Sequence, residues 1–364
     1  MNASIENRFP IHTVDGIDYK FAENETDIHV LDLKGYKEIM LVVGDKLKES
    51  KLEEKVTSDV ENQEPDVAAI RASMGWPQAV DIAENPLVIE NTLFGDVPVR
   101  TYVKEARQTE VLPAILFIHG GAFFGGSLDN ADLPCRCLAD LGDVRVISVD
   151  YGLAPEFPYP KGINDIFKTL IYMYQNHEAL HINRHHINVM GDSAGGNLTH
   201  VISHLDRVAG TCYVKNAVSL YPAVYLGYEE ETLNEIYDLK QFVANNPEEK
   251  QLIDLYVTDF RSSSVLVDQW YIKDTDPESW MVSPYNLSNE SLKVMPRTLI
   301  MTAEFDALRP QAEVFYHKAK HAGADFTYMC YGGMLHAFMD KIGDFNQAED
   351  CLKEAIHFIF ENKE

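Results

Sequence analysis

From about residue 112 to the C-terminal end, short hydrophobic runs alternate with amphipathic segments long enough for helices. The hydrophobic runs are continuous, which is the pattern of strands covered on both faces in a parallel sheet. We predict such strands over Leu112–His119, Val144–Asp150, Ile187–Gly191, Ala217–Leu220 and Thr298–Ala303. The amphipathic segments predict helices over Leu133–Asp140, Ile163–Asn176, Gly196–Arg207, Gln311–Ala322 and Gln347–Phe360. This alternation indicates an α/β fold, a mostly parallel central sheet with right-handed crossovers and flanking helices.

Three segments lie outside this repeat. Leu87–Thr92 and Val97–Val103 flank a turn-prone Phe-Gly-Asp and predict an antiparallel hairpin at the sheet edge. Residues 1–85 are acidic, with a helix expected over Lys37–Leu47 and a polar linker or exposed loop after it. Residues 223–282 are charged and rich in aromatic residues. A structureless loop of that length is uncommon inside a compact domain, so we predict a small helical subdomain there.

Composition narrows the classes of partner. The 364 residues include 46% hydrophobic and 24% charged residues, which are globular averages. Lys and Arg number 31 against 57 Asp and Glu, giving a formal net charge of −26. A field of this sign repels nucleic acid and anionic membrane surfaces. We therefore expect neither as a partner, while a homo-oligomer stays open.

Cysteine and histidine usage argues against a metal site. The five cysteines are scattered, and no CxxC pair or Cys/His ligand spacing occurs. His181, His185 and His186 form the densest histidine cluster. Two of them are sequence neighbours whose side chains diverge, so we interpret the cluster as structural. We expect no metal and no cofactor.

The N-terminal sequence and the hydropathy pattern bear on the compartment. The first residues have no basic stretch leading into an apolar one, so we expect no secretory signal. No run approaches 18 uninterrupted apolar residues, which argues against a membrane span. A reducing cytoplasm is the simplest expectation.

The strongest chemical signal is Gly191-Asp192-Ser193-Ala194-Gly195, placed between a predicted strand and a predicted helix. Gly-x-Ser-x-Gly in this context is the nucleophile elbow, a turn so tight that the positions flanking the serine call for glycine. The turn presents the Ser193 hydroxyl at the positive end of a helix. A turn without chemical meaning would match the same short pattern, but the strand and helix around it favour a nucleophile.

A second signal follows the first long parallel strand, at His119-Gly120-Gly121. Backbone N–H groups can stabilise an oxyanion during acyl transfer, and glycines let those groups face a ligand. We predict an oxyanion hole from the amides of Gly120, Gly121 and Ala194. His119 is interpreted as a structural residue that holds this loop.

A nucleophilic serine needs a base, and the base needs a carboxylate that orients it. Asp306 comes just after the predicted strand Thr298–Ala303, and His336 comes just after a further run, Phe326–Tyr331. The order serine, acid, histidine along the chain suits a nucleophile elbow. We predict Asp306 as the acid and His336 as the base, and we expect Glu304, two residues from Asp306, to point elsewhere.

Four blocks resemble the hormone-sensitive-lipase-like esterases of the α/β-hydrolase fold, in the branch with GDSAGG around the serine. They are HGGAFFGGS (119–127), DYGLAPEFPYPKGINDI (150–166), GDSAGGNL (191–198), and FDALR (305–309) with LHAF (335–338). The resemblance implies Ser193, Asp306 and His336 as a triad and Gly120, Gly121 and Ala194 as the oxyanion hole. It implies a catalytic domain of residues 86–222 and 283–364, with a cap built from residues 1–85 and 223–282. The expected activity is hydrolysis of small, short-chain esters without a cofactor.

The chain departs from the family pattern at two places. The usual Tyr-Arg-Leu-Ala-Pro-Glu-His has Gly152 in place of its arginine and Phe157 in place of its histidine. The usual Asp-Pro-Leu-Arg-Asp reads Asp306-Ala-Leu-Arg-Pro310. No catalytic group is lost, so we expect local packing to change and the chemistry to persist.

Two alternatives use the same fold. Formamidases share HGG and GxSxG and would direct the same triad at an amide. A non-catalytic ligand-binding protein related to this family would lack the catalytic histidine, whereas His336 is present in context. The aromatic residues of 223–282 would either line an apolar substrate pocket or pack a small core of their own.

Overall fold

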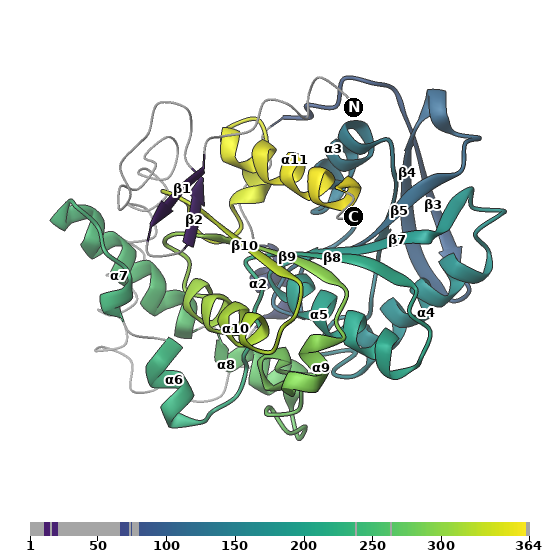
Figure 1. Cartoon of the computed structure of the whole chain (residues 1–364). Coiled ribbons are helices and arrows are strands. Elements are labelled where there is room, and N and C mark those ends of the chain that lie inside the picture. The colour runs from purple at the N-terminus through teal and green to yellow at the C-terminus, as the bar shows by residue number, and fades with distance from the viewer. Residues whose placement is uncertain are drawn as a thin grey trace.

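The computed structural model describes residues 11–14, 17–20, 66–72, 74, 80–236, 239–262 and 264–361. Ten strands among these residues form one sheet in the order β1-β2-β10-β9-β8-β7-β5-β6-β4-β3 (Figure 1). The strands are β1 (Ile11–Val14), β2 (Ile17–Lys20), β3 (Leu87–Phe94), β4 (Val97–Lys104), β5 (Leu112–Ile118), β6 (Arg145–Val149), β7 (Ile182–Asp192), β8 (Val214–Leu220), β9 (Arg297–Ala303) and β10 (Phe326–Tyr331). A parallel run of seven strands extends from β2 to β6 in this order, and β1, β4 and β3 add antiparallel pairs at its two ends. The sequence prediction of a mostly parallel α/β sheet is confirmed.

The antiparallel hairpin predicted at the sheet edge is also present. Strand β3 pairs with β4 around Gly95, and β4 pairs antiparallel with β6. The one large boundary difference is β7, which begins at Ile182 rather than Ile187. Its extra residues include Arg184 and His185, which are exposed where the strand starts, so the hydrophobic pattern does not reveal them.

The predicted helices cover both faces of the sheet. Helices α3 (Asp132–Gly142) and α11 (Asn346–Phe360) lie together on one face, and α4 (Lys161–Gln175), α5 (Ala194–Val208) and α10 (Arg309–His321) lie on the other (Figure 1). Each face has its own hydrophobic cluster: α3 and α11 contribute to one, and α4 and α5 to another. Because both faces are covered, the central strands consist of continuous hydrophobic residues, as expected of a buried parallel sheet.

Residues 223–282 are largely helical, as the sequence predicts. They contain α6 (Glu230–Ile236), a 3₁₀ turn at Leu239–Gln241, α7 (Pro247–Ser262), α8 (Ser264–Leu266) and a π-helical turn at Val267–Ile272. Most buried side chains of this insertion pack into these two clusters, and Val224 packs into a third. Phe242, Ile253 and Val257 belong to one cluster, and Val267, Trp270 and Tyr271 to the other. The insertion is therefore continuous with the core of the sheet, and its role as a cap stays a prediction.

The N-terminal segment contributes a hairpin to the sheet, which the sequence did not indicate. Strand β2 pairs parallel with β10, with Tyr19 opposite Cys330 and Lys20 opposite Tyr331. The Lys20 side chain is fully buried, and its Nζ donates to Asp350 Oδ2 at 2.9 Å and Glu354 Oε1 at 2.5 Å on α11. Described residues 66–72 add the short helix α2 (Val67–Ala72). The helix predicted over Lys37–Leu47 lies outside the described residues.

The buried ion cluster gives a stability prediction. We expect Lys20→Met to lower the free energy of unfolding by about 3–5 kcal/mol, because two buried carboxylates lose their cation. Lys168→Met is the matched control, since its ion pair with Asp96 is exposed. Urea denaturation measures both variants. Equal midpoints for the two would contradict the assignment of Lys20 as the anchor of the hairpin.

Candidate active site

The elbow is enforced by close backbone contact. Ser193 stands between β7 and α5 with φ 54° and ψ −116°. A Cβ on Gly195 would lie 1.9 Å from the Ile118 carbonyl oxygen, and one on Gly191 would lie 2.4 Å from the Gly195 oxygen. Holding a non-glycine residue at positive φ costs on the order of 1–3 kcal/mol. The Ser193 amide donates to the Leu220 oxygen at 2.9 Å, which helps to hold this conformation.

The three predicted triad side chains meet at the carboxyl edge of the sheet. His336 Nε2 lies 2.9 Å from Ser193 Oγ, and His336 Nδ1 lies 2.7 Å from Asp306 Oδ2. A carboxylate only accepts, so Nδ1 carries the proton and Nε2 can accept the serine proton. Asp306 is fully buried, and its other oxygen accepts the Leu308 amide at 2.8 Å. The arrangement fixes the tautomer and the direction of the imidazole ring.

Two aromatic rings that the sequence did not single out pack on His336. Tyr221, just after β8, and Phe260, on α7, each meet the imidazole edge-to-face, with centroid distances of 4.8 and 4.7 Å. Phe260 belongs to the insertion, so that segment reaches the predicted base directly. No spacing pattern in the sequence could have revealed these contacts, because they join residues from distant elements.

Glu304, expected to point away from the triad, and His119, interpreted as structural, both support loops of the site. Glu304 Oε2 accepts the Gly333 amide at 2.8 Å, which supports the loop before His336. His119 Nδ1 donates to the Gly120 oxygen at 2.8 Å, and the Tyr151 ring stacks on the His119 ring at 4.5 Å. Burial lowers the pKa of His119. It therefore stays neutral and holds the loop of Gly120 and Gly121.

The geometry corrects one part of the predicted oxyanion hole. The Gly120 amide donates to Asp192 Oδ1 at 2.9 Å, so its single proton is already taken by a buried carboxylate. Ala194 is the first residue of α5, where amides have no acceptor within the helix. Gly121 has φ 119°, and a Cβ there would lie 2.3 Å from Gly125. The Gly120 amide therefore holds the loop, and the oxyanion role of the Gly121 and Ala194 amides stays a prediction.

Asp192 is the site residue that sequence reasoning missed. Its only signal was its place before the serine in GDSAGG. Burial raises its pKa to about 6, while the hydrogen bond from Gly120 and the charge of His336 act in the opposite direction. Three further titratable side chains share this environment: Cys135, Tyr151 and Tyr221. A buried carboxylate therefore contacts residues 119–124, the proposed oxyanion loop.

The loop after Gly121 is strained. Ala122 and Phe123 have φ of 52° and 66°, and consecutive left-handed residues of this kind cost about 1–2 kcal/mol each. The Phe123 oxygen accepts the Ala154 amide at 3.0 Å. The Phe124 oxygen accepts Arg71 Nε at 2.5 Å. The loop is held in its shape by neighbouring segments.

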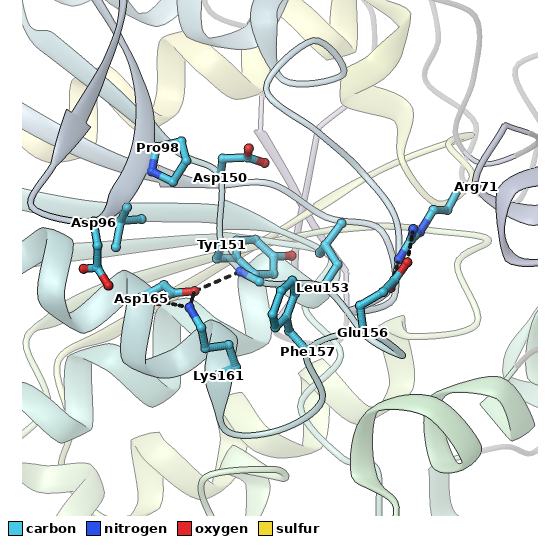
Figure 2. Close-up of a pocket in the computed structure, with 12 residues that line it drawn as sticks. Arg71, Asp96, Pro98, Asp150, Tyr151, Leu153, Glu156, Phe157, Lys161 and Asp165 are labelled. Carbon is cyan, nitrogen blue, oxygen red and sulfur yellow. Dashed lines mark hydrogen bonds and ion pairs between the residues drawn. The ribbon is translucent and has the colours of Figure 1, made fainter.

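The first of the two departures from the family pattern lies in a groove of about 400 Å³ beside this loop (Figure 2). Gly152 and Phe157 line it, and the Gly152 amide donates to Asp165, which is paired with Lys161. No triad residue is among the residues that line this groove. This departure therefore alters a scaffold loop, while the second, at Ala307 and Pro310, stands at the start of α10.

The described part of the chain offers neither a cluster of metal ligands nor a membrane helix. Within it, no group of three His, Cys, Asp or Glu side chains could hold a metal ion. No helix there is both long enough and apolar enough to cross a bilayer.

Comparison with known proteins identifies the family. A family model described as the alpha/beta hydrolase fold matches residues 115–340. An arylesterase of Saccharolobus solfataricus is 30% identical over 67% of this chain and 73% of its own length. Carboxylesterase NlhH of Mycobacterium tuberculosis is 29% identical over 67% of this chain and 72% of its own length. The solved structure of EstE1, a carboxylesterase from a metagenomic library, is 28% identical with a TM-score of 0.61, over 81% of this chain and 94% of that one. The chain belongs to the hormone-sensitive-lipase-like carboxylesterases of the α/β-hydrolase fold and is a carboxylic ester hydrolase.

Proposed function

We propose that this chain hydrolyses short-chain acyl esters through an acyl-enzyme on Ser193. The observation that carries the proposal is the continuous hydrogen-bond chain from Ser193 Oγ through His336 to Asp306. The ester class is supported by the relatives named arylesterase and carboxylesterase. The short acyl chain is supported by the family resemblance, and the net charge of −26 gives no attraction to an anionic lipid surface.

The reaction has two halves that use the same groups. His336 Nε2 takes the Ser193 hydroxyl proton while Oγ forms a bond to the ester carbonyl carbon. The resulting oxyanion is stabilised by the amides of Gly121 and Ala194. His336 then gives its proton to the leaving alcohol oxygen as the carbon–oxygen bond breaks. In the second half water attacks the acyl-enzyme, His336 takes its proton, and the acid leaves as the proton returns to Ser193.

Asp306 and Gly120 support this chemistry without bonding to substrate. The buried Asp306 carboxylate stabilises the imidazolium that forms when His336 takes a proton. Gly120 fixes the direction of the next amide, because its own amide is bound to Asp192. The proposed hole therefore has two amide donors and one positioning amide.

The triad is tested by removing its members singly and together. We expect Ser193→Ala to lower kcat on p-nitrophenyl butyrate by about 10⁴-fold or more, and His336→Ala to do the same. The double variant should be scarcely slower than either, because the two residues act as a unit. Asp306→Asn should be milder, since nucleophile and base both survive. Circular dichroism establishes that each variant is folded, and a folded Ser193→Ala with the parent rate would sink the proposal.

The substrate class is tested with a series of acyl chains. We expect kcat/KM on p-nitrophenyl esters to be greatest for acetate or butyrate and to fall as the chain lengthens. A parallel assay with formyl-kynurenine tests the amide alternative on the same preparation. Faster cleavage of formyl-kynurenine than of every ester would replace the esterase proposal with an amidase. Sugar acetates in the same series test the alcohol side.

Asp192 gives a prediction about pH. Its folded pKa of about 6 lies above the ordinary value of 3.8, so the protonated form is favoured by folding. The contribution of Asp192 to stability is therefore present below pH 4 and is lost as the pH rises through 6, by about 3 kcal/mol in all. Asn cannot ionise and still offers an oxygen to the Gly120 amide. Asp192→Asn should thus be more stable than the parent at pH 8, with a difference that shrinks toward pH 4. Urea denaturation across this range measures it, and a difference independent of pH would refute the assignment.

A further inference from the structure

The insertion contacts the strained oxyanion loop through a parallel ring stack. The Tyr271 ring lies on the Phe123 ring with a centroid distance of 4.1 Å and an interplanar angle of 6°. Next to it, Trp270 meets Phe124 edge-to-face at 5.0 Å. Tyr271 and Trp270 belong to the π-helical turn Val267–Ile272. Such turns are rare and occur often at functional sites.

The insertion is also fastened to the elbow helix at both of its ends. Asn197, four residues after Ser193 and fully buried, donates through Nδ2 to the Ala223 oxygen at 2.7 Å and to the Val282 oxygen at 2.8 Å. These carbonyls mark the beginning and the end of the insertion. Asn197 therefore fixes both ends of the insertion relative to Ser193. Tyr271 itself is held by Tyr159, whose amide donates to the Tyr271 oxygen at 3.2 Å and whose ring meets the Tyr271 ring edge-to-face.

We infer that Tyr271 is a positioning residue that holds Phe123, and with it the Gly121 amide, in the geometry required of the oxyanion hole. This inference rests on the proposed function. Phe123 follows Gly121 by two residues and has a left-handed backbone, which a phenylalanine adopts only when its surroundings require it. The stacked ring supplies that requirement on the side of the insertion. The Ala154 amide, which donates to the Phe123 oxygen, supplies it from the loop between β6 and α4.

The surroundings of the Tyr271 hydroxyl show whether Tyr271 acts through its ring or through a hydrogen bond. Among the described residues, Tyr271 Oη is buried and has no hydrogen-bond partner. The ring, rather than the hydroxyl, therefore makes the contact that matters. Tyr271→Phe keeps the stack and should behave as the parent does, while Tyr271→Leu keeps apolar volume but loses the planar ring.

The test compares these variants with a matched stack elsewhere. The Tyr174 ring stacks on the Tyr213 ring with a centroid distance of 3.6 Å and an interplanar angle of 13°. Tyr213 directly precedes β8, so this pair lies at the amino ends of the strands, whereas Ser193 lies at their carboxyl ends. Tyr174→Leu removes a similar ring pair without touching the oxyanion loop. Each variant is assayed on p-nitrophenyl butyrate and with two inhibitors of the same shape. An aryl trifluoromethyl ketone forms a tetrahedral adduct with the serine, so its Ki reports on the oxyanion hole. The corresponding methyl ketone binds without forming the adduct, so its Ki reports on binding of the unreacted ketone.

We expect Tyr271→Leu to lower kcat and kcat/KM together by roughly 10–100-fold, because both tetrahedral intermediates use the same hole. Its Ki for the trifluoromethyl ketone should rise by a similar factor, while its Ki for the methyl ketone stays within about threefold of the parent value. Tyr271→Phe and Tyr174→Leu should match the parent in all of these quantities. Because Ki does not depend on the folded fraction, it still reports on the hole if Tyr271→Leu is partly unfolded.

Two results would overturn the inference. One is a Tyr271→Leu variant whose Ki for the trifluoromethyl ketone equals that of Tyr174→Leu. The other is a Tyr271→Phe variant as impaired as Tyr271→Leu, which would make the hydroxyl the active part. Failure of the proposed function looks different. In that case the parent itself does not bind the trifluoromethyl ketone more tightly than the methyl ketone, and Ser193→Ala retains activity.

Discussion

The close approach of α5 to β5 is the constraint on which the rest of the site depends. The Gly195 Cα lies so near the Ile118 carbonyl that no side chain fits, and Ser193 is thereby forced to positive φ. Ile118 is also the last residue of β5, directly before His119 and the oxyanion loop. One backbone contact thus sets both the direction of the nucleophile and its distance from the loop that faces it. The acid and the base then follow the two strands beyond β8, as Asp306 and His336 do after β9 and β10.

The insertion belongs to this arrangement physically as well as topologically. Its ends are tied to α5 by Asn197, its middle stacks on Phe123, and its helix α7 places Phe260 against His336. A cover that merely enclosed substrate would need none of these contacts. Substitutions in the insertion are therefore expected to change turnover as well as substrate choice. Variation of this segment among related chains would then be limited at the positions that touch the loop and the base.

Much of this could be predicted from the sequence, because local rules determine it. Continuous hydrophobic runs located the central strands, and Gly-x-Ser-x-Gly located Ser193 through the space that glycine alone allows. Asp306 and His336 followed from their places after strands. The contacts of Asp192, Phe260 and Tyr271 could not be predicted, because each depends on a partner that is remote in sequence. The same reason hid Lys20, whose burial depends on carboxylates more than 300 residues away. A local pattern can also mislead: the polar side chains of Arg184 and His185 interrupt the hydrophobic run, so the first part of β7 was not predicted.

Two buried carboxylates, Asp306 and Asp192, lie near His336. In the proposed reaction the first would favour catalysis and the second would oppose it, and their hydrogen-bond partners differ accordingly. Asp306 points at Nδ1 and favours the positive charge that develops on the imidazole. Asp192 lies beneath the loop that must receive a negative charge, where an uncompensated carboxylate would oppose the oxyanion. The Gly120 amide donates a hydrogen bond to this carboxylate, which partly compensates its negative charge and holds the loop in place. Since Gly120 is thus occupied, the proposed oxyanion hole depends on the amides of Gly121 and Ala194. The orientation of Gly121 is then critical, and a segment outside the sheet that holds it in place becomes part of the requirement for catalysis.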